Sequence, residues 1–254
     1  KSSTLAFTGT LQWDKPPPEL GTRFSIIPFL SGQGSEEIDA GTPPDNDANS
    51  GLDAKVTLST SLNLDLTINP DFSQVEVDQQ RTNLDRFELF FPEKRQFFLE
   101  NSDLFASLGN RNIRPFFSRR IGLSSPVRGG ARLSGKLGSN YRLGIMSMQT
   151  DANEETPASN FTVATLQRKI LTRSSLSIFL VNKESDLQEN ANGSKNSYNR
   201  VGGIDFNLAS ADNLWTGKTF FHQAIYKNAG DNAFAAATSI KYNTGTVSAH
   251  MGYS

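Results

Sequence analysis

Residues 61–69 read SLNLDLTIN, and apolar and polar side chains alternate strictly along them. Successive side chains of a β-strand point to opposite faces, so this pattern predicts a strand with one apolar and one polar face. The polar face carries small side chains rather than the lysine and glutamate common on solvent-facing strands. Small polar groups fit a crowded, wet interior. The apolar face consists of Leu62, Leu64, Leu66 and Ile68.

The same alternation recurs along most of the chain, while helical periodicity is scarce. Many of the segments span about ten residues, which exceeds the usual five or six of globular sheets and matches the 9–11 needed to cross a bilayer. The predicted strands number about twelve and lie near residues 4–13, 22–31, 51–59, 62–70, 130–138, 141–150, 160–170, 174–183, 200–209, 213–227, 232–242 and 246–254.

The connections between these segments are sorted by length. Links at 59–61, 138–140, 171–175, 208–213 and 243–245 are short, whereas those at 31–50, 150–160 and 182–199 are long and polar. Short turns at one rim and long loops at the other are typical of outer-membrane barrels. Tyr141, Trp13, Trp215, Tyr242 and Tyr253 fall near predicted strand ends, where aromatic girdles belong.

Composition excludes several classes of protein. The 254 residues include 25 Lys plus Arg and 26 Asp plus Glu, so there is no basic surface for nucleic acid. Cysteine is absent, which excludes disulfides, thiolate metal sites and thiol catalysis. No apolar run approaches the roughly 18 residues of a membrane helix, and no signal peptide is recognisable at Lys1. We expect no metal and no cofactor.

Residues 71–129 interrupt the strand pattern. A structureless loop of that length is improbable in a compact domain, so the segment is expected to have its own fold or function. Residues 86–105 read RFELFFPEKRQFFLENSDLF and combine aromatic rings with charges of both signs. Such a segment fits the lumen or mouth of a barrel as a plug-like insertion. The alternative is a surface cap with a small core of its own.

Several consecutive motifs resemble one family. They are LDLTINPDFSQVEVDQQRTNLDRFELFFPEKRQFFLENSDLF (64–105), RPFFSRRIG (114–122) and PVRGGARLSGKLG (126–138). This run is similar to an uncharacterised outer-membrane barrel family of Bacteroidetes and related Gram-negative bacteria. Members generally carry an N-terminal domain similar to family 9 carbohydrate-binding modules. The segment GTLQWDKPPPELGTRFSIIPFL (9–30) resembles the junction before that barrel. The resemblance supplies no catalytic residues and implies a larger barrel, of which this chain is expected to be a piece.

Charged residues of the insertion are the candidate ligand-binding groups. Their alternative role is ion pairing within the segment. A run of arginines that includes Arg114 and Arg132 would select anionic ligands in a pore, unless it serves charge balance. Aromatic residues would stack on sugar rings, unless they form the core of the segment; they include Phe97, Phe98, Phe116 and Phe117. The candidate binding residues are Glu76, Asp78, Arg86, Glu88, Glu93, Arg95, Glu100, Arg119 and Arg120.

Covalent catalysis is poorly supported by the sequence. Only His222 and His250 offer a base near neutral pH, and no GxSxG elbow is present. We expect His250 in the lumen or at an interface and His222 at a membrane interface. Paired carboxylates would permit glycoside hydrolysis, but their spacing here is not specific.

The sequence therefore predicts an all-β, antiparallel up-and-down transmembrane β-barrel over residues 1–254, with 71–129 inserted. The expected role is porin-like binding or passage of a small solute or glycan fragment at the bacterial outer membrane, without enzymatic activity. Expected partners are outer-membrane lipid, that solute, and other outer-membrane or periplasmic proteins, with no nucleic acid. The alternatives are a soluble extracellular β-sandwich that binds polysaccharide and a carboxylate-dependent glycoside hydrolase.

Overall fold

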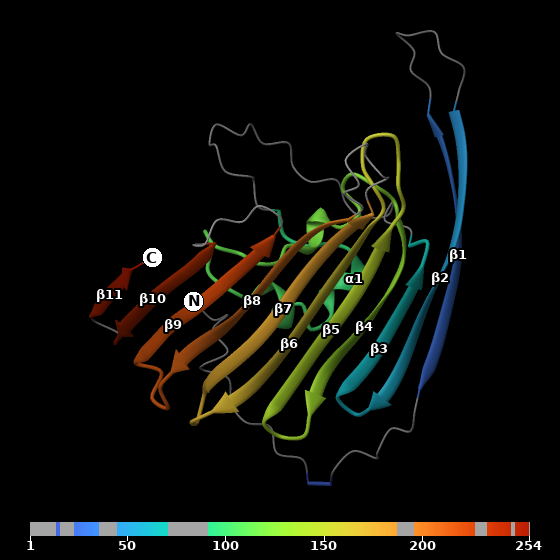
Figure 1. The fold of residues 1–254 in the computed structure, drawn as a ribbon. Coiled ribbons are helices and arrows are strands. Elements are labelled where there is room, and N and C mark those ends of the chain that lie inside the picture. Colours follow the sequence, from blue (N-terminus) through green and yellow to red (C-terminus); the bar gives the residue numbers. More distant parts are fainter. Residues whose placement is uncertain are drawn as a thin grey trace.

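Among the residues that the structure describes, eleven antiparallel strands form one sheet in which every strand pairs with its neighbours in the sequence (Figure 1). The computed structural model describes residues 14–15, 23–35, 45–70, 91–186, 196–226, 233–244 and 247–253. The strands are β1 (Phe24–Ser35), β2 (Asp45–Ser59), β3 (Leu62–Ile68), β4 (Val127–Leu137), β5 (Tyr141–Thr150), β6 (Ser159–Ile170), β7 (Ser174–Asp186), β8 (Asn196–Ala209), β9 (Trp215–Tyr226), β10 (Phe234–Asn243) and β11 (Ser248–Tyr253).

The all-β, up-and-down architecture predicted from the alternation is confirmed, and the sheet is open. Eleven of the predicted strands are present, and the remaining one, residues 4–13, lies outside the described residues. β2 begins at Asp45 and β8 at Asn196, several residues before the predicted starts. Both extensions are polar and resemble loop sequence, but ladder pairing with β1 and β7 carries them on as strands.

The sorting of connections by length is also confirmed. The turns after β2, β4, β6 and β8 lie at one end of the sheet, and the strand ends that the longer links join lie at the other end, together with the described link 151–158 (Figure 1). Leu171 and Asn213 adopt left-handed backbone conformations in two of these turns. Among the described residues, no helix is long and apolar enough to cross a membrane.

The two faces of the sheet differ in polarity. We call the face that carries residues 91–126 the inward face and the opposite one the outward face. On β7, the outward Leu176, Ile178 and Leu180 are 38%, 51% and 52% exposed, whereas the inward Ser177 and Phe179 are 3% and 6% exposed. Other large exposed side chains of the outward face are Phe24, Ile26, Leu30, Leu58, Leu66, Ile68, Leu137, Tyr141, Ile145, Ile204, Trp215, Phe221, Ile225, Phe234, Met251 and Tyr253.

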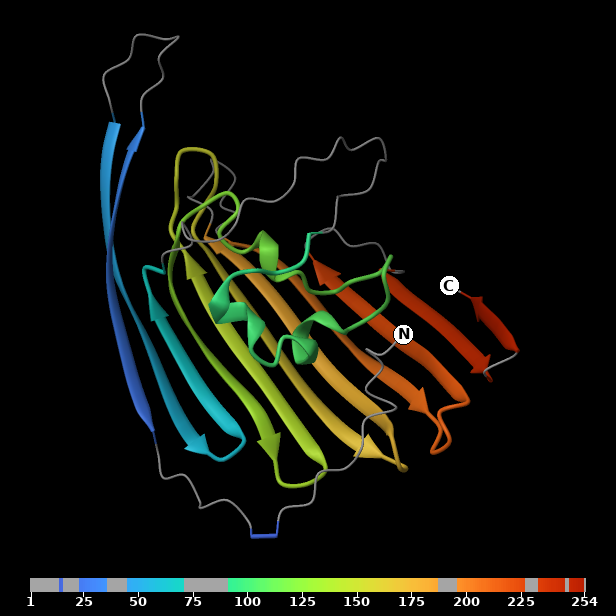
Figure 2. The same ribbon diagram turned by 180° about the vertical axis from the view of Figure 1, so that it is seen from behind.

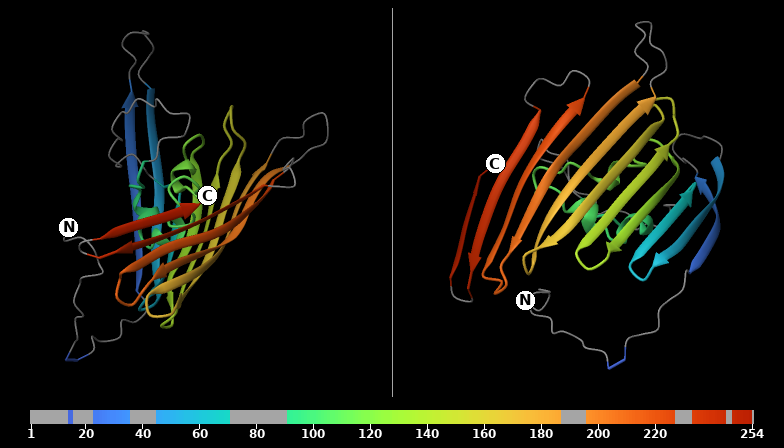
Figure 3. Two further views of the ribbon diagram at one scale, coloured as in Figure 1. Left: turned by 90° about the vertical axis from the view of Figure 1, so that its left-hand side faces the viewer. Right: turned by 60° about the horizontal axis from the view of Figure 1, so that its bottom comes forward.

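The described part of the insertion, residues 91–126, lies on the inward face, and we call it the insert (Figure 2). The sheet curves around it, so the insert occupies the concave side (Figure 3). It contains two single-turn helices, α1 (Gln96–Leu99) and α2 (Asp103–Ala106), and a 3-10 turn, η3 (Ser118–Arg120). Because β4 starts at Val127, the insertion ends at residue 126, three residues before the predicted boundary.

Candidate functional site

Aromatic and aliphatic side chains of the insert form the main apolar core together with the inward face. Phe98 and Phe105 come from α1 and α2, and they pack with Met146 and Met148 of β5 and Val163 of β6. Met146 pairs with Val163 in the ladder, which places both side chains on the inward face. The phenylalanines of the insert thus serve largely as core. The remaining buried members are Leu104, Ile121 and Val127.

A first charged cluster lies within the insert. The Arg95 guanidinium donates to both carboxylate oxygens of Glu93 at 2.9 and 2.8 Å, and the Ser118 hydroxyl donates to Glu93 Oε2 at 2.6 Å. Arg95 also donates to the carbonyl oxygens of Ile121 and Ser118. Arg95 is buried, and its hydrogen bonds join the α1 region to η3.

Electrostatics keep Glu93 ionised. Burial raises the pKa of this carboxyl, but hydrogen bonds from Arg95 and Ser118 outweigh burial and hold the pKa below its ordinary value. The arrangement is that of a structural ion pair.

A second charged cluster joins the insert to the sheet. Glu100 follows α1 and accepts hydrogen bonds from Lys55 of β2 and from Asn63 Nδ2 of β3 at 2.6 Å. Arg132 of β4 is 2% exposed and donates to Asp65 Oδ2 at 2.8 Å and to the Glu100 carbonyl at 2.9 Å. Burial raises the pKa of Glu100, and the hydrogen bonds from Lys55 and Asn63 lower it by more.

A third cluster anchors the other end of the insert. Asp205 of β8 accepts a hydrogen bond from the Gly109 amide at 2.8 Å and contacts His222 Nε2 at 2.7 Å and Lys218 Nζ at 3.1 Å. Lys218 also donates to the Ser107 carbonyl. Asp205 and His222 are 1% and 3% exposed and therefore lie buried beneath the insert, whereas the Lys218 side chain is 21% exposed.

The predicted interfacial position of His222 is wrong. His222 pairs with Gly203 across the ladder and points inward, with its ring 4.8 Å from that of Phe179 and 4.5 Å from that of Phe220. The sequence does not reveal this orientation. Phe220 and Phe221 are consecutive apolar residues, so the alternation does not show which side chains of β9 face inward. His250, expected in the lumen or at an interface, pairs with Lys241 on the inward face.

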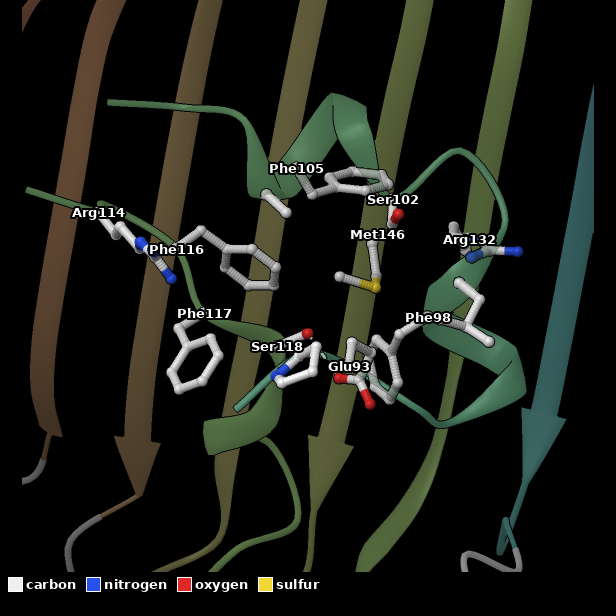
Figure 4. Close-up of a pocket in the computed structure, with 13 residues that line it drawn as sticks. Glu93, Phe98, Ser102, Phe105, Arg114, Phe116, Phe117, Ser118, Arg132 and Met146 are labelled. Atoms are coloured by element: carbon white, nitrogen blue, oxygen red, sulfur yellow. Dashed lines mark hydrogen bonds between the residues drawn. The ribbon is translucent and has the colours of Figure 1, made fainter. Parts of the chain in front are cut away.

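A pocket of about 250 Å³ opens between the insert and β5 (Figure 4). Its walls are mainly apolar and include Phe98, Phe105, Phe116, Phe117 and Met146 (Figure 4). Polar groups also reach the pocket, from Glu93, Ser102, Arg114, Ser118 and Arg132.

The predicted binding residues are only partly brought together. Glu93 lines the pocket, Arg95 holds Glu93, and Glu100 lies in the second cluster. Arg119 and Arg120 lie in η3 and do not line the pocket. Arg132, expected either to select anions or to balance charge, is paired with acidic groups. Glu76, Asp78, Arg86 and Glu88 lie outside the described residues.

Sequence reasoning missed four charged sheet residues of these clusters. Lys55, Asp205 and Lys218 contact the insert, and Asp65 pairs with Arg132 of the neighbouring strand. Each is an isolated charge on the polar face of a strand, which resembles an ordinary solvated position. The signal was their place on the inward side, where a charge needs a partner. Among the described residues, no group of three or more His, Asp or Glu side chains is arranged to hold a metal ion.

A family model described as a domain of unknown function (DUF5916) matches residues 20–136. No curated protein and no solved structure matches the chain. The matched stretch contains β1–β3, the insert and all but the last residue of β4. Over this stretch, the sequence is similar to the DUF5916 family of domains of unknown function.

Proposed function

We propose that this chain forms part of a transmembrane β-barrel in a bacterial outer membrane, with the insert inside the barrel as a plug. In this proposal the protein binds or passes a small solute and performs no covalent chemistry. The outward face meets lipid, and the inward face meets the insert and water.

The reversed polarity of the sheet carries the proposal. Charged and polar groups such as Asp65, Arg132 and Asp205 are buried on the inward face, while leucine, isoleucine and aromatic side chains stand exposed on the outward face. A water-soluble sheet of one layer would turn its apolar face toward a core. Alternation with apolar residues outside and polar residues inside is the pattern of membrane barrels.

Strand length and aromatic placement support the same proposal. β5 and β10 have 10 residues and β6 has 12, enough for a tilted strand to cross the hydrocarbon layer. Trp215 and Tyr242 lie at the ends of β9 and β10 with ring centroids 4.7 Å apart, next to the short turns. Such a pair fits an interfacial aromatic girdle.

Closure is the part of the proposal that goes furthest beyond the open sheet. β1 and β11 each have one neighbour among the described strands. Unpaired backbone groups are not tolerated in hydrocarbon, so the proposal requires both free edges to pair in the membrane, with each other or with further strands. The curvature of the sheet around the insert is in the direction that closure needs (Figure 3).

The alternatives explain less. A soluble β-sandwich needs a second sheet over the outward face, and the described strands form a single sheet. A glycoside hydrolase needs a general acid whose pKa is raised. Glu93 and Glu100 instead have lowered pKa values and cationic partners. These two carboxylates are better suited to structure than to acid catalysis.

Fractionation tests the proposal. The chain is expressed in a Gram-negative host with an added secretion signal, and outer membranes are washed with carbonate. We expect retention in the membrane and heat-modifiable migration on a gel. Ile240→Arg on the outward face should abolish retention, because a charge facing lipid costs about 2–4 kcal/mol, whereas Ser239→Arg on the inward face should not. Release of the unmodified chain into the soluble fraction would refute the membrane assignment.

A further inference from the structure

We infer that the pocket between the insert and β5 binds a small, uncharged molecule with one or two apolar rings. This inference names the solute class for the solute-binding role proposed above. The pocket itself is built by the insert and the inward face, so its chemistry can be tested whether or not the sheet lies in a membrane.

Size sets the first limit on the ligand. An apolar cavity of about 150 Å³ holds one benzene molecule. The pocket here has about 250 Å³, which suits one substituted ring or two fused rings. It is too small for an oligosaccharide.

The walls favour flat apolar rings. Phe98 and Phe105 are buried and fixed by the core, and Phe105 lies 6.4 Å from Phe116, centroid to centroid. A ring ligand would lie among these groups and Met146, whose thioether makes favourable contacts with aromatic edges. Aromatic pairs prefer such offset or edge-to-face geometries.

Two of the charged groups at the pocket, Glu93 and Arg132, disfavour a sugar. Both carboxylate oxygens of Glu93 already accept hydrogen bonds from Arg95, and one of them also accepts from Ser118. The guanidinium of Arg132 is engaged by Asp65 and the Glu100 carbonyl. A sugar in this pocket would lose hydrogen bonds to water and find these partners already occupied. That loss disfavours a pyranose, whereas an apolar ring loses nothing.

Binding of indole tests the inference, with cellobiose as the contrasting ligand. The full chain is used in lipid nanodiscs, or in buffer if it proves soluble, and binding is followed by titration calorimetry. We expect saturable 1:1 binding of indole and none of cellobiose. Ala106 lines the pocket, so Ala106→Phe should fill it and weaken indole binding at least 10-fold. The matched variant Ala152→Phe, in an exposed connection between β5 and β6, should bind as the parent does.

A second variant guards against misfolding. Phe116→Leu keeps an apolar side chain but removes one ring, and it should weaken indole binding about 3- to 10-fold. Indole uptake that does not saturate, or that is the same in Ala106→Phe and Ala152→Phe, would reflect partition into lipid and overturn the inference. Cellobiose binding that Ala106→Phe abolishes would also overturn it. Membrane retention is scored separately, so failure of one proposal is distinguishable from failure of the other.

Discussion

Phe105 of the insert occupies the space that a side chain at Gly144 of β5 would fill. A Cβ atom at residue 144 would lie 2.8 Å from Phe105 Cζ and 3.0 Å from Thr165 Cγ2. Gly144 is on the inward face in line with Met146, so the missing side chain creates a recess in an otherwise continuous surface. The sheet is thus shaped to receive this one aromatic ring.

Filling this recess should loosen the insert. The larger side chain of Gly144→Val pushes Phe105 away from the sheet, and overpacking of a core typically costs about 1–3 kcal/mol. We expect hydrogen exchange of amides in α1 and α2 to accelerate about 5- to 100-fold while amides of β7 stay unchanged. Gly202→Val is the matched control, because a Cβ at residue 202 meets nothing closer than 3.7 Å. Equal exchange in the two variants would show that Phe105 does not depend on this recess.

Removal of the buried Arg132 charge should strongly destabilise the fold. Arg132→Met leaves Asp65 buried without its closest cationic partner, and breaking such a pair costs about 3–5 kcal/mol. We expect most of this loss in equilibrium unfolding, and partial recovery in the double variant Arg132→Met, Asp65→Leu. Arg142→Met breaks a more exposed pair with Asp103 and should cost at most about 1 kcal/mol. Similar losses for both arginines would contradict the buried-cluster account.

Asp205 should control the attachment of residues 107–113. Asp205→Asn weakens the contacts to His222 and Lys218 and alters the acceptor of the Gly109 amide. We expect the Gly109 amide to exchange at least 10-fold faster. The amide of Phe98, whose side chain packs in the apolar core, should change little. Asp212→Asn, in the exposed turn after β8, provides the control. Unchanged exchange at Gly109 would exclude Asp205 as the anchor.

Acid should release the insert through Glu93. The pKa of Glu93 is lowered from its ordinary 4.5, so the free carboxyl binds protons more readily than the docked one. Its stabilising contribution is therefore complete above about pH 4.5 and is lost as the pH falls through the lower, docked pKa. Insert amides should keep constant protection from pH 7 to 5 and lose it below.

Glu93→Gln is the control for this pH dependence. The amide cannot ionise, so the variant should start with weaker protection at pH 7 and change less on acidification. The acidic loss would persist partly, because the pKa of Glu100 is lowered too. An identical pH profile in the variant and the parent would exclude Glu93 as a source of the effect.

The strands were predictable because one-sided burial imposes a period of two, and 61–69 shows it without exception. Their exact ends were not, because Asp45 and Asn196 start polar extensions that only ladder pairing reveals. The insertion was recognisable from its length and composition. The buried ion pair of the sheet beneath it was not recognisable, since Arg132 and Asp65 are 67 residues apart in sequence and meet only through the β3–β4 register.

The candidate site was predictable to a similar extent. Glu93, Arg95 and Glu100 stood out because they interrupt an aromatic stretch, and they do lie beside the pocket or hold the insert. Asp205 did not stand out, because it has no charged neighbour in sequence, and His222 stood out but was expected at a membrane interface. Their partnership arises from adjacent strands, which local pattern cannot place in register.

The most direct test of the central claim uses β10, where Ala235, Ala236 and Ala237 are consecutive. The chain has no cysteine, so single substitutions to cysteine give one labelling site each. Spin labels at residues 235–240 in reconstituted membranes report accessibility to oxygen, which dissolves in lipid, and to a water-soluble nickel chelate. We predict a period of two, with 236, 238 and 240 accessible to oxygen and 235, 237 and 239 to the chelate. Chelate accessibility at all six positions would place the outward face in water and contradict the barrel.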